Sequence, residues 1–242
     1  MHAEERIASR VDEAFANVAG TADLVLLAGD LTAHGEPQEM SIVAAACARL
    51  DLPAYAVLGN HDHHANRVHE LTSILEDAGV VVLERSWTTV SVGGTTLGIA
   101  GTKGFVGGFP GSTLPDFGEP LLREVYAETG KDVAALDRAL EEIAECELRV
   151  VLLHYSPTMS TLVGEPESIW TFLGSNRLDG PIQKHRPDLV LHGHAHAGTF
   201  AGSIGPVPVY NVAVHVMRRD FFVFELDSDA PDGRGARLEA TV

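Results

Sequence analysis

The chain has 242 residues, with 34 Asp and Glu against 17 Lys and Arg, so its formal net charge is −17. This balance argues against a protein that grips nucleic acid by its phosphates or docks on an anionic membrane surface, because both need clustered basic residues. No run of about 18 apolar residues is present, so no transmembrane helix is predicted, and the N-terminal sequence is neither a signal nor a transit peptide. Only Cys47 and Cys146 are present, which excludes a disulfide framework and makes a cytoplasmic location the default expectation.

The first half of the chain predicts helices that alternate with short buried strands. Continuous apolar runs, typical of strands buried on both faces, lie at residues 23–28 and 54–58. Helices are predicted over residues 3–19, 36–50 and 66–78. This alternation indicates a parallel α/β architecture.

The second half of the chain changes character, with several strands joined by short turns and one long helix. That helix is predicted over residues 120–145, with a break near Gly130. The remaining predictions are strands within residues 80–100, a Gly/Pro-rich loop at 101–115, a strand at 149–153, a loop with one or two helices at 156–187, a strand at 188–191, and closing strands within 199–214 and 220–226. We expect a single domain over residues 1–226, followed by a polar tail over residues 227–242.

Polar side chains follow four of the predicted strands, at the point where each strand ends. They are Asp30, then Asn60, His61 and Asp62, then His154, then His194 and His196. Any one of these features alone has an ordinary structural explanation, such as a turn or a buried histidine. Because sites in open α/β sheets form beyond the carboxyl ends of strands, residues far apart in sequence are expected to converge there. Asp, Asn and His together suit Zn, Mn, Fe or Ni, so the sequence predicts a metal site.

These motifs resemble those of the calcineurin-like metallophosphoesterase superfamily, over about residues 22–212. The family pattern runs D-x-H, G-D, G-N-H-D/E, H and G-H-x-H. The last four motifs stand here as Gly29-Asp30, Gly59-Asn60-His61-Asp62, His154 and Gly193-His194-Ala195-His196. The resemblance implies an α/β fold, a four-layer αββα sandwich of two mixed β-sheets flanked by helices, with metals at the strand ends.

The resemblance also implies a role for each residue of the site. Asp30 would bridge two divalent metal ions. One ion would also bind Asn60, His154 and His194, and the other would bind His196 and His2. His61 would stabilise the phosphoryl oxygens or protonate the leaving oxygen, and a hydrogen bond from Asp62 would orient it. A hydroxide between the two ions would be the nucleophile.

This chain departs from the family pattern at the first motif, because no D-x-H precedes Asp30 inside the chain. The histidine in the right region is His2, with Met1 at the x of the motif. We therefore expect that the chain begins inside this motif, without the first strand and one metal-binding aspartate. The resemblance implies two divalent ions, and the absence of that aspartate leaves open a chain that holds one. The alternative is that His2 is a terminal residue with no role.

The expected function is metal-dependent hydrolysis of a small phosphodiester or nucleotide, with neither a nucleic acid nor a membrane as partner. Two alternatives stay open: a scaffold or impaired member of the same fold, and a nuclease or pyrophosphatase. Lys103 lies in the Gly/Pro-rich loop and is notable in a chain with few cations, although a surface loop is the favoured interpretation. For the histidines outside the motifs, loop or structural roles are favoured over substrate contact; they include His34, His63, His64, His192 and His215.

Overall fold

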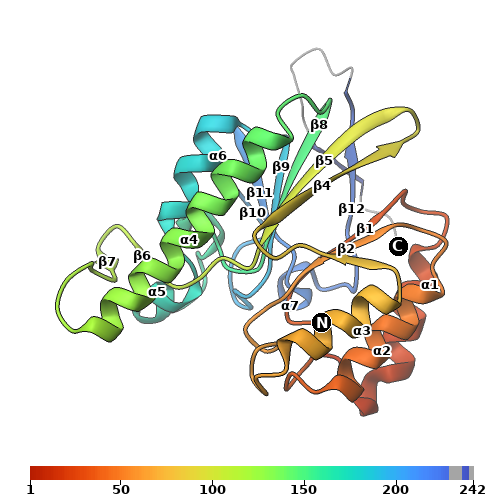
Figure 1. Cartoon of the computed structure of the whole chain (residues 1–242). Helices are drawn as coiled ribbons and strands as arrows, with labels where there is room; N and C mark the ends of the chain where they lie inside the picture. The colour runs from red at the N-terminus through yellow and green to blue at the C-terminus, as the bar shows by residue number, and fades with distance from the viewer. Residues whose placement is uncertain (229–235, 240–242) are drawn as a thin grey trace.

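The computed structural model describes residues 1–228 and 236–239 and places two β-sheets between two layers of helices (Figure 1). The first sheet has three parallel strands in the order β1-β2-β3. Its strands are β1 (Val25–Ala28), β2 (Ala54–Val57) and β3 (Val80–Val82). The helices on its outer face are α1 (Ala8–Val18), α2 (Pro37–Ala48) and α3 (Val68–Asp77), with a 3₁₀ turn at Glu5–Ile7 before α1.

The second sheet has six strands in the order β10-β11-β9-β8-β5-β4 and is mixed. Its strands are β4 (Ser86–Val92), β5 (Thr95–Thr102), β8 (Leu148–Leu153), β9 (Leu189–His192), β10 (Ala201–Ile204) and β11 (Val207–Asn211). The β4–β5 and β10–β11 pairs are antiparallel, and the central pairs are parallel. The helices α4 (Pro120–Glu142) and α6 (Asp179–His185) cover its outer face.

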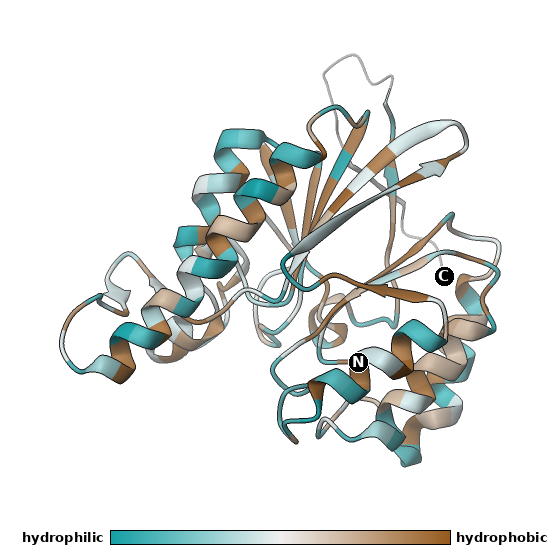
Figure 2. Cartoon of the chain, viewed as in Figure 1, coloured by the Kyte–Doolittle hydropathy of each residue, from teal (hydrophilic) through white to brown (hydrophobic). Residues whose placement is uncertain are grey.

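Three apolar cores separate the four layers, and the strands explain why. Alternate residues of a strand point to opposite faces, so a strand buried on both faces is apolar throughout. In β8, Val151 and Leu153 pack toward α4 and α6, whereas Val150 and Leu152 pack toward the first sheet. Figure 2 shows the same pattern, with hydrophobic strands inside and hydrophilic residues along the outside of the helices. The predicted four-layer sandwich is confirmed.

The predicted break in the long helix is wrong, because α4 runs without interruption from Pro120 to Glu142. A single glycine costs a helix only about 1 kcal/mol, which the packed face of a long helix offsets. A Cβ at position 130 would lie 3.0 Å from Nη2 of Arg177. Gly130 therefore admits the Arg177 side chain, which donates to the carbonyl of Tyr126 on the same helix.

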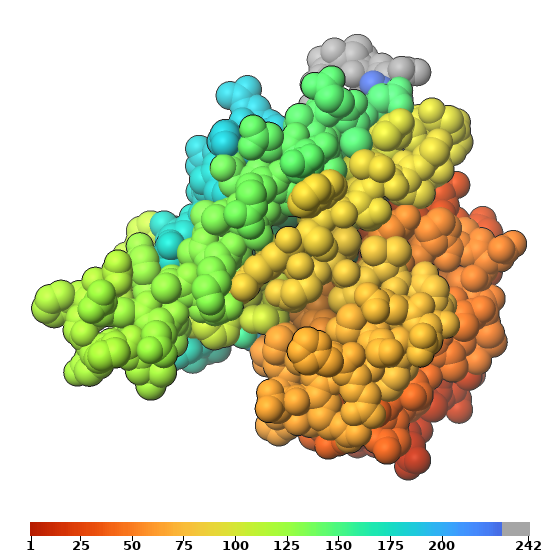
Figure 3. All heavy atoms as spheres, viewed as in Figure 1, coloured from red at the N-terminus to blue at the C-terminus, as the bar shows by residue number. Residues whose placement is uncertain are grey.

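The remaining short elements lie in the segments predicted as loops or closing strands. They are β6 (Gly108–Phe109), β7 (Ser112–Thr113), α5 (Trp170–Leu173), α7 (Val214–Met217), β12 (Val223–Leu226) and β13 (Ala236–Glu239). The β6–β7 hairpin and the start of α4 project from the body of the molecule, as Figure 3 shows from the same side. The predicted polar tail lies partly outside the described residues; of it, β13 pairs with β12 in antiparallel fashion. Among the described helices none has the length and apolarity that a membrane crossing requires.

Candidate metal centre

Asp30 stands at the centre of the site, directly after β1. Its backbone adopts a left-handed conformation with φ +50°, which is uncommon for a residue with a side chain. Oδ1 of its carboxylate accepts a hydrogen bond from the backbone N–H of His61 at 2.9 Å and lies 3.2 Å from Nε2 of His154. Oδ2 lies 3.7 Å from Nε2 of His2. The two oxygens of one buried carboxylate therefore face two different histidines.

The first group of potential ligands joins Asp30 to residues at the ends of β2, β8 and β9. These residues are Asn60, His154 and His194. Nδ1 of His154 lies 2.9 Å from the carbonyl of Ala28, so it carries the ring proton and donates it there. The lone pair of Nε2 then faces Oδ1 of Asn60 at 2.9 Å as well as the carboxylate of Asp30. Three electron-rich atoms so close together fit a cation between them.

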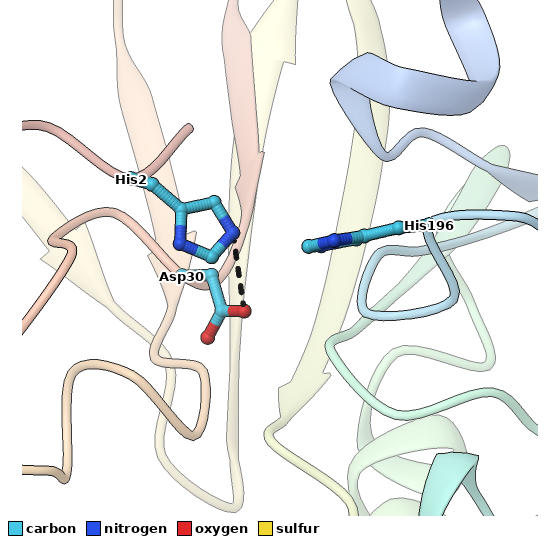
Figure 4. Close-up of side chains that lie close together, drawn as sticks. All are labelled: His2, Asp30 and His196. Carbon is cyan, nitrogen blue, oxygen red and sulfur yellow. Dashed lines mark ion pairs between the residues drawn. The ribbon is translucent and has the colours of Figure 1, made fainter. Parts of the chain in front are cut away.

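The second group consists of His2, Asp30 and His196 (Figure 4). His2 and Asp30 come from the first-sheet side of the site, and the ring of His196 reaches toward them from the opposite side. His2 is held by its backbone, whose N–H donates to the carbonyl of Asp30 at 2.8 Å. Its Nε2 is buried and has no hydrogen-bond partner among the described residues. A buried imidazole nitrogen with a free lone pair fits a metal ligand.

Electrostatics keep these imidazoles neutral, which is the form that binds metals. Burial is the largest cause in each case. It lowers the pKa of His2 to about 3, with further lowering by the terminal ammonium and neighbouring histidines. Burial also lowers the pKa of His154, well below its usual value, and of His194 and His196.

The donor spacing also fits metal coordination. With metal–ligand bonds of about 2.1 Å, adjacent ligand atoms of a tetrahedral or octahedral ion lie about 3.0 to 3.5 Å apart. The 3.2 Å separation of His154 and Asp30 falls within that range, and the 3.7 Å separation of His2 and Asp30 is slightly longer. The ligand atoms of Asp30, His154 and His194 lie within 4.8 Å of one another, and so do those of His2, Asp30 and His196. The residues present therefore fit two ions that share one carboxylate.

Two glycines let the strand ends come this close. A Cβ at position 59 would meet the backbone nitrogen and Oδ1 of Asp30, and would lie 2.7 Å from Cε1 of His154. A Cβ at position 29 would lie 2.5 Å from Nδ1 of His154. Gly29 also has φ +80°, which favours glycine. The glycines of both motifs thus serve the approach of Asp30 to His154.

The predicted hydrogen bond between Asp62 and His61 is wrong. The Asp62 carboxylate instead accepts from the backbone N–H groups of Leu31 (3.2 Å), Thr32 (2.8 Å) and Gly59 (2.8 Å), and from the Thr32 hydroxyl (2.6 Å). Asp62 is fully buried, and burial raises its pKa against the opposing effect of these bonds. It therefore ties the loop after β1 to the loop after β2.

The carbonyl of Ala33, and not Asp62, orients the His61 ring by a hydrogen bond. It lies 2.7 Å from Nδ1 of His61, which therefore donates its proton there. Nε2 is then the nitrogen that can act on a substrate. The ring stands edge-on to that of His2, with centroids 4.3 Å apart, so His61 lies beside the candidate ligands without joining either group.

Two histidines outside the motifs also lie near the site. His192 is fully buried and bonds to Thr161 and to the carbonyl of Gly193, as its predicted structural role requires. The ring of His215 stacks on that of His196, with centroids 4.6 Å apart and an interplanar angle of 26°. The sequence favoured a loop or structural role for His215 over contact with substrate. No local sequence signal places His215 beside His196, because this contact depends on α7, which returns to the site after β11.

The comparisons with known proteins bear on this geometry. A family model described as calcineurin-like phosphoesterase matches residues 2–198. The chain belongs to the calcineurin-like phosphoesterases. The curated proteins gave no match.

Solved structures share the fold of this phosphoesterase at low sequence identity. Phosphopantetheinyl hydrolase from Mycobacterium tuberculosis has a TM-score of 0.63 and 15% identity, over 87% of this chain and 85% of that chain. A putative 5′-nucleotidase from Staphylococcus aureus has a TM-score of 0.57 and 16% identity, over 95% of this chain and 46% of that chain. GAP50, the anchor in the inner membrane complex of Plasmodium, has a TM-score of 0.54 and 10% identity, over 98% and 72%. At these identities the likeness shows the fold alone.

Proposed function

We propose that this phosphoesterase hydrolyses a small phosphoester at a centre of two divalent metal ions. The observation that carries the proposal is the carboxylate of Asp30, whose two oxygens face separate groups of nitrogen and oxygen donors. Such ligands suit Mn, Fe, Zn or Ni. Asn60, His154 and His194 would complete one ion site, and His2 and His196 the other.

The residues of the chain divide the remaining work. When bound, the ions supply charge neutralisation for the phosphoryl oxygens and lower the pKa of a nearby water. Asp30 would contribute a carboxylate oxygen to each group of donors and would offset part of the positive charge of the ions. His61 keeps Nδ1–H on the carbonyl of Ala33, which leaves Nε2 as the nitrogen that can act on a substrate. When the ring is protonated, that nitrogen can donate a hydrogen bond to a phosphoryl oxygen or a proton to the leaving oxygen.

A small diester or nucleotide is the proposed substrate. The net charge of −17 disfavours a long polyanion, whereas a small anion needs only the local positive charge of the metal centre. A panel of a diester, a monoester, pyrophosphate and single-stranded DNA, each with Mn²⁺, separates the candidates. Hydrolysis of the small esters supports the proposal. Preference for DNA or pyrophosphate would replace it with the nuclease or pyrophosphatase alternative, and no turnover with any metal would favour a scaffold.

Metal stoichiometry tests the two-ion centre directly. Elemental analysis after mild dialysis should give two ions per wild-type chain. It should give one ion in His196→Ala, because that change leaves the group around His154 intact. His69→Ala, on the exposed face of α3, is the matched control and should retain two ions. One ion or none in the wild-type chain would overturn the shared-carboxylate arrangement.

His61→Ala tests the acid–base assignment. Turnover should fall by about two to four orders of magnitude, as is usual when an acid–base group is lost. Metal content should stay the same, because His61 belongs to neither ligand group. His69→Ala again serves as control. Unchanged turnover would remove His61 from the mechanism, and loss of metal would reassign it to ligand support.

A further inference from the structure

Lys103 lies at the same sheet edge as the metal centre, in a position that the proposed function does not use. It directly follows β5, the strand next to β8 in parallel register. Its carbonyl accepts hydrogen bonds from the backbone N–H groups of His154 (3.1 Å) and Tyr155 (3.0 Å). Lys103 is thus fixed one strand away from a candidate metal ligand.

Lys103 differs from the other two lysines in how its charge is compensated. Lys131 and Lys184 are exposed and form ion pairs with carboxylates at 2.6 and 2.8 Å. Lys103 is half-buried, and no ion pair within 4.0 Å forms at its ammonium among residues 1–228. Among the described residues its hydrogen-bond acceptor is the carbonyl of Gly104 at 3.1 Å, whereas an ammonium has three N–H donors.

The nearby carboxylate of Asp132 does not meet this demand. It is already bonded to Arg85 at 2.9 Å and to the hydroxyl of Thr102 at 2.6 Å. Burial lowers the pKa of Lys103, with the attraction of Asp132 and Glu84 opposing it. In a chain with twice as many acidic as basic residues, a half-buried cation without a paired carboxylate is a costly arrangement unless an anion binds it.

Aromatic rings connect the ammonium to the metal centre. Nζ lies 4.5 Å from the ring centre of Phe105 and 5.1 Å from that of Tyr155. The Tyr155 ring in turn lies 4.4 Å from the ring of His194. The charge of Lys103 also acts on His63, which lies in the loop that carries His61. The pKa of His63 is lowered first by burial and then by this lysine. The Tyr155 ring therefore contacts both the ammonium of Lys103 and a candidate metal ligand.

We propose that the Lys103 ammonium binds a second phosphate group of the substrate, beside the phosphoryl group held at the metal centre. This inference rests on the proposed function and narrows it to phosphoesters with a further phosphate within reach, such as nucleoside bisphosphate esters. The Phe105 and Tyr155 rings hold the side chain in place through cation–π contacts. Lys103 is then a specificity residue of the phosphoesterase.

A matched substrate pair tests this. Thymidine 5′-(p-nitrophenyl phosphate) and its 3′-phosphorylated form share the scissile bond and the chromophore and differ in the second phosphate. The wild-type chain with Mn²⁺ should have the higher kcat/KM for the 3′-phosphorylated form. In Lys103→Met the ratio of the two kcat/KM values should fall by about tenfold to hundredfold, as expected for loss of a charged hydrogen bond. Lys103→Arg should keep most of the ratio, and Lys131→Met, which removes a surface lysine, should keep all of it.

An unchanged ratio in Lys103→Met, or no preference in the wild-type chain, would overturn the inference. If Lys103→Met does not fold, Lys103→Gln and the wild-type preference decide it. If the wild-type chain hydrolyses neither ester, the proposed function fails on its own. Calorimetric binding of the same two compounds to wild type and Lys103→Met then decides the inference through the ratio of their dissociation constants.

Discussion

The Asp62 carboxylate offers the sharpest test of how the site is built. It accepts four hydrogen bonds, two at each oxygen, from the loops after β1 and β2. In Asp62→Asn, one oxygen becomes an NH₂ group that faces donors in either orientation. One or two buried backbone N–H groups then lose their acceptor, each at a cost of about 1–3 kcal/mol.

The expected loss of unfolding free energy is therefore about 1–6 kcal/mol. For a chain of this size, 1 kcal/mol corresponds to a shift in Tm of about 2–4 °C, so Tm should fall by about 2–24 °C. Thermal unfolding followed by circular dichroism measures it, without added metal. Asp77→Asn is the matched control, since Asp77 is exposed at the end of α3 and its replacement should stay within about 0.5 kcal/mol. Identical melting of the two variants would show that the carboxylate does not hold the loops together.

Two further variants probe the close approach at the site and the network behind it. Gly59→Ala places a Cβ against the carboxylate of Asp30 and should abolish metal binding in elemental analysis. Gly180→Ala, with open space around it, is the control and should bind metal as wild type does. Metal retained by Gly59→Ala would show that the strand ends can separate freely. Arg85→Met leaves the buried carboxylate of Asp132 without its cation and should cost about 2–4 kcal/mol in denaturant unfolding, reduced from the fully buried case because Arg85 is 28% exposed. Arg123→Met, which breaks an exposed pair, should cost under about 1 kcal/mol, and equal costs for the two arginines would contradict this account.

The four layers of the fold were predicted through the family resemblance, and the convergence of the motif residues was predicted from their positions after buried strands. Buried strands have continuous apolar runs, and the polar residue that follows each run marks a strand end, so Asp30 and His154 could both be expected at the carboxyl ends of strands. That these two strands belong to different sheets was not evident from the runs. A helix break at Gly130 was wrongly predicted, because the low helix propensity of one glycine is weaker evidence than the packing of a long helix. Arg177, which packs against Gly130, lies far away in sequence, so the contact could not be predicted.

The fine structure of the site was not predictable in the same way. Asp62 was assigned to its neighbour His61, but three of its four hydrogen bonds come from backbone N–H groups, which no residue type signals, and the fourth comes from the hydroxyl of Thr32, 30 residues away. The left-handed conformation of Asp30 depends on what surrounds it, not on its own preference. The contact of His215 with His196 depends on the path of the chain after β11. Tertiary contacts decide all three.

The candidate ligands come from both sheets, with Asp30 and Asn60 after strands of the first and His154 and His194 after strands of the second. An ion bound to all of them would be a cross-link between two halves that also meet through apolar packing and through the hydrogen bond from His154 to the carbonyl of Ala28. Only a chain with its sheets docked can hold that ion, so metal content reports on docking as well as on chemistry. At a free metal concentration of about one hundred times Kd, the docked state would gain about 2.7 kcal/mol. Metal supply would then shift the equilibrium between docked and separated sheets.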